Sequence, residues 1–420
     1  MSGQIGNNIL RVSGVIAATA AGLNWVSTVV TASTLTAEAG NGYFINTTSN
    51  TCTITLPSSA EAGDQIVLMD YLRTWGTNKI IIDSNGLNYQ GQDDTYTVEY
   101  DTNGETLNIV YSGATQGWIP LDDDVVADVP VAPPTQKAIF GYGYVGAASS
   151  LTNLVSSSGV IATDTTGVGT ARNGIAAAAY GTDKAIFAYG AAGPVVSVSN
   201  LVSNSGVVAT DTTGVGHARD GLAAAGYGST GQAIFGYGNG GGNVSITNLV
   251  NNSGVVATDT TGVGTARQGI AAAGYGTDKA IFAYGHTGSY VSVSNLVTNA
   301  GVVGTDVSGV GTNRSGLAAA VYGTDKAIFG YGTTGSDVGM TNLVNSSGVV
   351  AADVSGVGTS RAYLAAAAYG GDKAIFAYGR TGSNVSLSNL VNNSGVVATD
   401  TTGVGTARRT LAGAGYSISA

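Results

Sequence analysis

The sequence predicts an all-β protein, and three observations carry the prediction. A block of about 47 residues recurs six times, and each copy contains apolar runs of strand length. The glycines, 65 in all, recur at matching places between those runs, where turns are needed. Ahead of the repeats lie six further short apolar runs, divided by Gly, Asn, Ser and Pro. No segment has the 3.6-residue apolar period of a helix over helix length.

Residues 1–29 are expected to form a docking or oligomerisation segment. Residues 12–30 carry no charge and follow Arg11, and the triplet Ala18-Thr19-Ala20 resembles a signal-peptide cleavage site. A signal peptide and a membrane anchor are therefore alternatives for this stretch. Its Ser, Gly, Asn and Thr make it a poor membrane span, so we expect no membrane insertion.

Residues 30–121 are predicted to form a small all-β domain, a sandwich or a compact barrel. Its single cysteine, Cys52, excludes an intrachain disulfide and is expected to be a buried free thiol. Residues 122–136 are acidic and Pro-rich, which indicates an extended linker. The predicted strands of the domain are residues 43–46, 52–56, 65–70, 79–83, 96–100 and 106–111.

Residues 137–420 contain the repeats, which two anchors mark. The phenylalanine of an AIF motif recurs every 47 or 48 residues. An arginine that closes a GVGxxR motif recurs with it, always eight residues after an aspartate. These aspartate and arginine pairs are Asp164 and Arg172, Asp211 and Arg219, Asp259 and Arg267, Asp306 and Arg314, Asp353 and Arg361, and Asp400 and Arg408.

Each copy is predicted to hold four short strands. In one copy these are residues 270–275, which are rich in Ala, then 279–284, 291–297 and a strand that starts at 302–306. Four strands in a unit of this length, repeated six times, are typical of the blades of a β-propeller.

The two ends of the array complement each other. The first copy begins at its second strand, residues 137–142, and the chain ends just after a spare first strand, residues 411–416. Pairing these two would close a ring and remove its free sheet edges. The sequence therefore predicts a six-bladed propeller closed by the C-terminal strand.

Several classes of chemistry are excluded by composition. The net charge of −10, without a basic cluster, argues against a nucleic-acid partner. One cysteine, and two histidines in different copies, His217 and His286, give no zinc-site spacing. The Gly-rich loops lack the Lys-Ser ending of a phosphate loop, and ATDTTG lacks the carboxylates of a calcium loop. We expect no metal, no cofactor and no enzymatic activity.

The repeated aspartates and arginines allow two interpretations. Paired carboxylates could serve a glycosidase. An active site is asymmetric, however, whereas every copy carries the same pair. We therefore expect a structural ring of charge-assisted hydrogen bonds that joins the fourth strand of one blade to the next blade.

Ligand contacts are expected where the copies differ. The residues after each arginine and the loops after the GYG or AYG motif should share one face of the ring, and they vary from copy to copy. Aromatic, amide and charged side chains in these loops are typical of a surface that binds a glycan or a surface protein. Neutral sequence drift in unconstrained loops is the alternative explanation for their variation. The candidate contacts are Tyr144, His286, Tyr290, Asp337, Tyr363, Arg380 and Asn384.

The order of motifs in residues 137–420 resembles kelch repeats. An arginine precedes a strand of small residues, a turn, an AIFGYG strand and two outer strands. The tryptophan that closes a kelch blade is absent. The resemblance implies kelch-like geometry and no particular partner.

The N-terminal region contains the segments 42–57 (GYFINTTSNTCTITLP), 62–66 (AGDQI), 78–86 (NKIIIDSNG) and 107–121 (LNIVYSGATQGWIPL). Together with the AIFGYG and SGVVATDTTGVGTAR repeats, they resemble tail-fibre and other virion proteins of tailed phages, marine ones in particular. The resemblance implies an exterior virion appendage, often homotrimeric, whose N-terminal region docks on other virion proteins.

Three functions are therefore considered. The leading one is a virion appendage, such as a tail fibre, whose propeller binds a host-surface glycan or protein. The alternatives are a decoration or adaptor protein of the particle without a host ligand, and an enzyme that degrades glycans.

Overall fold

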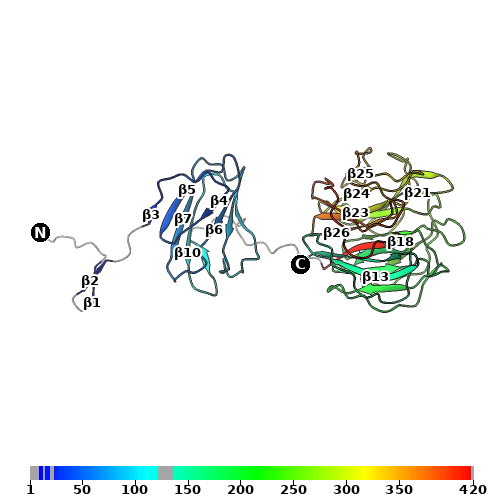
Figure 1. Ribbon diagram of the computed structural model, residues 1–420, viewed down its shortest axis with the longest axis horizontal. Helices are drawn as coiled ribbons and strands as arrows, with labels where there is room; N and C mark the ends of the chain where they lie inside the picture. Colours follow the sequence, from blue (N-terminus) through cyan, green and yellow to red (C-terminus); the bar gives the residue numbers. More distant parts are fainter. Residues whose placement is uncertain (1–8, 13–14, 19–22, 122–135, 418–420) are drawn as a thin grey trace. The chain divides into compact units, whose positions relative to one another are not determined.

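The computed structural model describes residues 9–12, 15–18, 23–121 and 136–417 (Figure 1). Every regular element among them is a β-strand, which confirms the all-β prediction. The chain divides into two compact units, residues 1–133 and 134–420. No helix among the described residues has the length and apolarity that crossing a membrane requires.

The N-terminal segment contributes one described hairpin. β1 (Ile9–Val12) pairs antiparallel with β2 (Val15–Ala18). The expected docking or oligomerisation role of residues 1–29 stays a prediction, and residues 1–8, 13–14 and 19–22 lie outside the described residues.

Two sheets make up the rest of the N-terminal unit. Successive strands from β3 to β8 alternate between the sheets, and each strand from β5 to β8 pairs in parallel with the strand two places before it. Residues 24–83 therefore wind as a coil, and β9, β10 and β11 close it with antiparallel pairs. In order, the five-stranded sheet has β11 (Trp118–Pro120), β10 (Thr106–Tyr111), β7 (Gln65–Asp70), β5 (Asn41–Ile45) and β3 (Asn24–Trp25), and the four-stranded sheet has β4 (Thr34–Thr36), β6 (Cys52–Thr55), β8 (Ile80–Asp83) and β9 (Val98–Tyr100).

Both sheets contribute side chains to one buried cluster. Period-two alternation buries Ile66 and Leu68 of one sheet against Ile80 and Ile82 of the other. Cys52 belongs to the same cluster, and burial raises the pKa of its thiol to about 11. The prediction of a buried free thiol is confirmed.

All six strands predicted for this unit are present, with ends shifted by up to two residues. The sequence missed β3, β4 and β11, which are only two or three residues long and too short to show an alternating pattern. Because β3 belongs to the five-stranded sheet, the folded part begins before residue 30.

Six three-stranded sheets form the second unit, here called the repeat domain, and each sheet is called a repeat unit. From its first to its third strand, unit 1 has β29 (Ala412–Tyr416), β12 (Lys137–Tyr144) and β13 (Ala148–Val155); unit 2 has β14 (Ala176–Tyr180), β15 (Lys184–Ala188) and β16 (Ser199–Val202); unit 3 has β17 (Ala223–Tyr227), β18 (Gln232–Gly236) and β19 (Thr247–Val250); unit 4 has β20 (Ala271–Tyr275), β21 (Lys279–His286) and β22 (Tyr290–Val297); unit 5 has β23 (Ala318–Tyr322), β24 (Lys326–Gly330) and β25 (Thr341–Val344); unit 6 has β26 (Ala365–Tyr369), β27 (Lys373–Ala377) and β28 (Ser388–Val391).

The predicted fourth strand is wrong as a continuous strand. The segment after the third strand touches it only at isolated bridges, as Val303 does with Val297 and Val307 with Ser294. Between these bridges Asp306 turns its carboxylate to the backbone and hydroxyl of Thr265, which belongs to the neighbouring unit. These contacts to the next unit replace ladder hydrogen bonds within the sheet.

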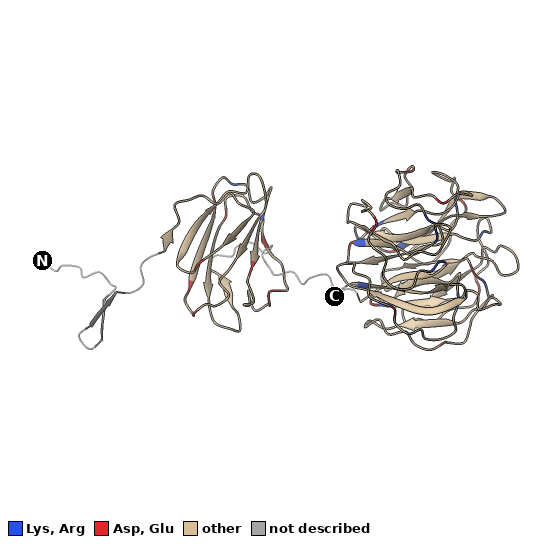
Figure 2. Cartoon of the chain, in the orientation of Figure 1, with Lys and Arg blue, Asp and Glu red and all other residues tan. Residues whose placement is uncertain are grey.

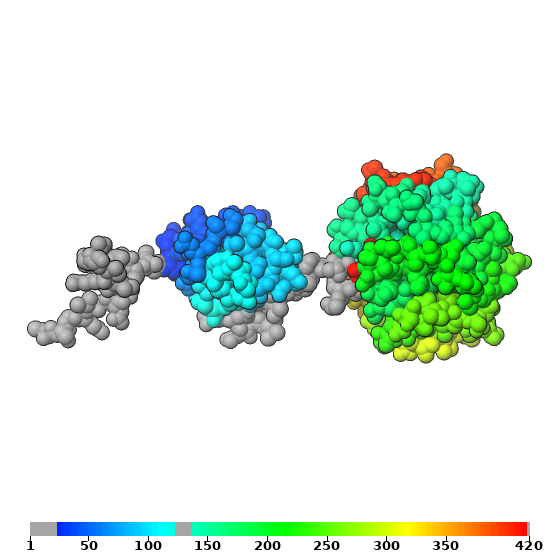
Figure 3. Space-filling model, turned by 90° about the horizontal axis from the view of Figure 1, so that it is seen from below, coloured from blue at the N-terminus to red at the C-terminus, as the bar shows by residue number. Residues whose placement is uncertain are grey.

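The first strands of the six units contact one another in cyclic order, β29, β14, β17, β20, β23, β26 and again β29. The predicted pairing of the chain's two ends is present. β29 pairs antiparallel with β12, from Lys137 opposite Tyr416 to Gly141 opposite Ala412. In Figure 3 the red end of the chain accordingly adjoins the teal start of the repeat domain.

Candidate functional site: the loop face of the repeat domain

The repeat domain has two distinct faces. At one, called the turn face, short turns such as residues 276–278 join the first and second strands. At the other, called the loop face, the second and third strands are joined by loops that differ in sequence, such as residues 379–384. Gln136 lies at the turn face, where its side chain and carbonyl accept hydrogen bonds from Gly371 and Gly370. The chain therefore enters the repeat domain at the turn face, away from the variable loops.

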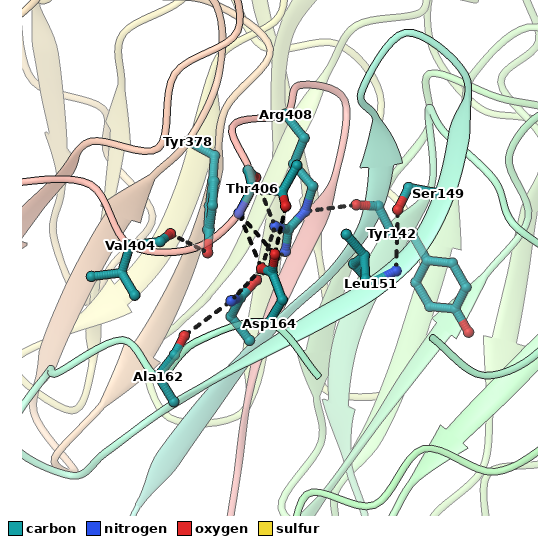
Figure 4. Close-up of polar contacts among 10 residues, drawn as sticks. Tyr142, Ser149, Leu151, Ala162, Asp164, Tyr378, Val404, Thr406 and Arg408 are labelled. Carbon is teal, nitrogen blue, oxygen red and sulfur yellow. Dashed lines mark hydrogen bonds and ion pairs between the residues drawn. The ribbon is translucent and has the colours of Figure 1, made fainter. Parts of the chain in front are cut away.

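A buried arginine joins each unit to the next, and Arg408 shows how (Figure 4). Its Nε donates to the carbonyl of Tyr142 at 2.9 Å and its Nη2 to Oδ1 of Asn153 at 2.6 Å, both in unit 1. Its guanidinium also lies 4.2 Å from the centre of the Tyr378 ring of unit 6. One side chain thus connects the last unit to the first.

Asp164 completes this network without a direct hydrogen bond to the arginine. Its carboxylate accepts hydrogen bonds from the backbone and hydroxyl of Thr406 and from Nδ2 of Asn153. Burial would raise the pKa of Asp164, but these hydrogen bonds and the charge of Arg408 outweigh it and lower the pKa. Burial lowers the pKa of Arg408, although an arginine stays charged in proteins.

The same network recurs around the domain and corrects one detail of the prediction. In four of the ion pairs, those of Arg172, Arg314, Arg361 and Arg408, an arginine nitrogen lies 3.6 to 3.8 Å from an aspartate oxygen. This distance is too long for a hydrogen bond. A fully buried asparagine in the third strand bridges the two charges instead. Of the hydrogen bonds described for Arg408, Arg172 makes only the one to its asparagine, Asn200. The bridging residues are Asn153, Asn200, Asn248, Asn295, Asn342 and Asn389.

Sequence reasoning missed these asparagines. Each lies at the same place in the SNLV or TNLV motif of its copy, so their repetition was visible. Their burial was not, because Asn is more often exposed than buried. The network recurs in all six units, although Arg172 makes fewer of its hydrogen bonds, and this repetition identifies it as framework rather than as a site that one ligand would select.

Six backbone hydrogen bonds form a ring. Each member of the ring lies in the short segment between a framework arginine and the first strand that follows it in the chain. Each N–H donates to the carbonyl of the preceding member, at 2.7 to 2.9 Å, and the sixth bond returns to the first residue. All members have a positive φ between 52° and 61°. They are Gly174, Gly221, Gly269, Gly316, Tyr363 and Thr410.

Two members of this ring depart from glycine. Tyr363 (φ 57°) and Thr410 (φ 52°) adopt the left-handed conformation that glycine adopts without penalty. For other residues it costs about 1–2 kcal/mol. These two residues belong to units 6 and 1, which adjoin where the chain's ends pair.

Five of the predicted contacts meet near these two ring positions. The guanidinium of Arg380 lies over the Tyr363 ring, 5.4 Å from its centre, and 4.0 Å from the carboxylate of Asp337. Nδ2 of Asn384 donates to the carbonyl of Tyr144. Asn384 and Arg380 pair with each other in an isolated β-bridge of the same loop, so the contact of Asn384 with Tyr144 connects Tyr144 to this group.

Arg409, which was not on the list of predicted contacts, belongs to this group. Its guanidinium lies 4.8 Å from the centre of the Tyr144 ring, and its backbone pairs with Tyr144. Its place directly after Arg408 was a visible signal, since the other copies have Asn, Asp, Gln, Ser or Ala there. We call Tyr144, Asp337, Tyr363, Arg380, Asn384 and Arg409 the tyrosine–arginine sector.

The remaining two candidates lie elsewhere. His286 and Tyr290 pack edge to face in unit 4, with ring centres 5.2 Å apart. No hydrogen bond, ion pair or ring contact among the described residues links them to the tyrosine–arginine sector. The seven predicted contacts therefore form two groups, and the first is the larger.

A groove of about 470 Å³ adjoins the sector at Asp337. It exists because unit 5 has Gly339 where the other units have a serine, as Ser386 in unit 6. In unit 6 that serine hydroxyl fills the space beside Gly403. In unit 5 the corresponding space is open, and its lining includes Ser355, Ser360, Met340 and the carboxylates of Asp337 and Asp353.

A second cavity, of about 390 Å³, lies among the first strands of all six units. Alanines and glycines line it, and its rim includes Tyr180, Thr277 and Lys279 of the turn face. None of the predicted contacts lines it. The cavity follows from the small side chains that let six first strands approach one another.

The described residues contain no group of three or more His, Cys, Asp or Glu side chains placed to hold a metal ion. Charged side chains are sparse on the molecule (Figure 2). No known protein-family model matches the sequence, and no curated protein is significantly similar to it.

Proposed function

We propose that this protein is a non-enzymatic recognition protein whose repeat domain is a six-bladed β-propeller. The cyclic contacts of the first strands and the pairing of β29 with β12 support the propeller. The ring of backbone hydrogen bonds, which returns to its first member, supports closure as well.

The observation that carries the recognition role is the contrast between framework and loop face. The network of arginines and asparagines recurs in every unit. The loops at the loop face differ in sequence, and in one sector they bring tyrosine and arginine side chains together. Tyr and Arg are over-represented among the residues that contribute most to binding energy. Gln136, where the described part of the repeat domain begins, lies at the opposite face.

We further propose that the protein is an exterior appendage of a tailed-phage virion, such as a tail fibre. The resemblance of residues 42–57 and 107–121 to virion modules supports this setting. In it, the N-terminal unit would attach to other virion proteins, as a homotrimer, and the loop face would meet the host surface.

Binding of the labelled full-length protein to a glycan array and to a panel of bacterial cells tests the recognition role. The variant Tyr144→Ala/Arg380→Ala should lose binding. The matched turn-face variant Lys184→Ala/Lys326→Ala should keep it. If both variants bind alike, or the intact protein binds nothing, the recognition role fails and the adaptor role replaces it.

A further inference from the structure

The tyrosine–arginine sector points to a particular class of ligand. We propose that it binds a saccharide that carries a carboxylate, such as a uronic acid. This inference rests on the proposed recognition function and names the chemistry of its ligand. Three features of the described residues support it: two arginines at the loop face, a strained tyrosine beside them, and polar atoms without hydrogen bonds.

Arg380 and Arg409 are the two arginines of the repeat domain outside the buried framework, and only Arg380 faces a carboxylate, that of Asp337, at the outer limit of ion-pair distance. The other basic side chains of the repeat domain are the six buried framework arginines and lysines beside the turns of the turn face. Arg380 has one carboxylate at 4.0 Å, and Arg409 has none within ion-pair distance among the described residues. In a chain of net charge −10, two such cations in adjoining units make a local site for an anion.

Tyr363 indicates that the site is built for contact with a flat apolar surface. Four units place glycine at its ring position, where an L-residue is strained, yet unit 6 places a large aromatic side chain there. Its ring is half-buried beside Arg380, and the ring of Tyr144 lies beside Arg409. Two tyrosines beside two arginines suit a sugar, whose C–H face packs on an aromatic ring while its carboxylate meets a guanidinium.

Unpaired polar atoms complete the site. Nε of Arg380 and Oδ1 of Asn384 are both buried, and neither has a hydrogen-bond partner among the described residues. One is a donor and the other an acceptor, so together they match a ligand that carries both hydroxyl groups and an anionic oxygen. Nε and Nη1 of the framework residue Arg172 are likewise buried without a hydrogen-bond partner, so the two atoms of Arg380 and Asn384 support a site only together with the charges and rings around them.

An acidic peptide is the competing ligand, and the backbone argues against it. Extended peptides bind most readily by adding a strand to a free sheet edge. Around the sector the backbone groups are already paired, Ala362 with Arg380, Tyr144 with Arg409, and Tyr363 within the six-membered ring. Recognition therefore falls to side chains. The open groove beside Asp337 carries the carboxylates of Asp337 and Asp353 as well as serines and glycines, so we place the anionic sugar at the arginines and not in the groove.

Titration of the full-length protein with three probes tests the proposal. The probes are a galacturonic-acid trisaccharide, its methyl ester and a polyglutamate peptide. We expect the free acid to bind and esterification to weaken it about tenfold or more, because the ester removes the charge that the arginines meet. Arg380→Gln and Arg409→Gln should each weaken the free acid by a similar factor, whereas Lys184→Gln on the turn face should not.

Tyr363→Gly separates a binding role from a structural one. Glycine relieves the strained conformation, so the thermal midpoint should rise or stay unchanged while affinity for the trisaccharide falls. A lower midpoint with unchanged affinity would make Tyr363 structural and overturn its assignment.

The outcomes also distinguish this inference from the recognition function on which it rests. Equal binding of acid and ester, or tighter binding of polyglutamate, would overturn the carboxylated saccharide. If neutral glycans nevertheless bind and Tyr144→Ala abolishes that binding, recognition at the loop face stands. Absence of any ligand on the array and on cells would remove both.

Discussion

The N-terminal unit has one continuous core, whereas the repeat domain divides its core into six clusters. In the N-terminal unit, large side chains such as Trp75, Trp118 and Tyr100 fill a single space between two sheets. In the repeat domain each cluster combines two neighbouring sheets, as Phe140 of unit 1 does with Ile375 and Tyr378 of unit 6. The first unit is stabilised by side-chain volume, and the second by contacts that every sheet must share with both its neighbours.

The polar network follows the same division. Each buried arginine stacks on a tyrosine of one unit and bonds to an asparagine of the next, and all but Arg172 also bond to backbone carbonyls, so the arginines act between sheets rather than within one. A core built from such links depends on the presence of every unit. A core that fills one space depends on individual large side chains. Four experiments exploit this difference.

Deletion of residues 407–420 should have the largest effect. It removes β29, and with it the first strand of unit 1, together with Arg408, which links units 6 and 1. We expect the repeat domain to unfold as a whole while the N-terminal unit keeps its own transition, as calorimetry would resolve. A repeat domain that still melted at its normal temperature would contradict the closed ring.

Trp118→Ala should destabilise only the N-terminal unit, by about 3–5 kcal/mol, since it opens a cavity in a single packed core. Trp118 is fully buried, whereas Trp25 is 40% exposed and Trp25→Ala serves as the control. Urea unfolding followed for each transition measures both. Loss of stability in the repeat-domain transition would show that the two cores are coupled.

Arg267→Ala should destabilise the repeat domain by about 1–3 kcal/mol, because it leaves buried acceptors without a donor. Those acceptors are the carbonyls of Tyr284 and Thr265 and Oδ1 of Asn295. Arg380→Ala, at the exposed loop face, should change stability by less than about 0.5 kcal/mol. If Arg267→Ala left stability intact but removed ligand binding, the framework assignment of the arginines would be wrong.

Acid should weaken the repeat domain gradually. Burial raises the pKa of Asp211, Asp306, Asp353 and Asp400, but hydrogen bonds from Thr and Asn and the nearby arginine together lower it below its usual value. A lowered pKa in the folded state contributes stability that is present above the usual aspartate pKa and is lost as pH falls through the lowered value. The free energy of unfolding should therefore decrease below about pH 4.

The alkaline limit has the opposite sign and a different cause. Burial raises the pKa of Tyr142, Tyr189, Tyr237 and Tyr378 to about 12. These tyrosines contribute stability below the ordinary pKa near 10, and it is lost as pH rises from there toward 12. Urea titrations at intervals from pH 2.5 to 11.5 would measure both limits. A free energy of unfolding that stayed flat below pH 4 would exclude the aspartate network as a source of stability.

Several elements of this protein were predictable because their signal is local. Ile80–Asp83 and Lys279–His286 alternate or carry continuous apolar runs between turn residues, so strand type followed from spacing. Short strands such as Asn24–Trp25 gave no such signal. The buried asparagines were visible as a repeated letter, but their burial depends on partners far along the chain, such as Arg408, 255 residues from Asn153.

The sequence by itself determined the number of units, the order of their strands and the complementarity of their ends, because repetition and periodicity are properties of neighbouring residues. The tertiary structure decided which residues meet. It placed Arg408 against Asn153 and reduced the predicted fourth strand to isolated β-bridges. It also brought Tyr363, Arg380 and Arg409 into one sector, with His286 in another unit. The reason is geometric. Spacing in the sequence measures distance along the chain, whereas contact between units depends on how each sheet is placed against the next.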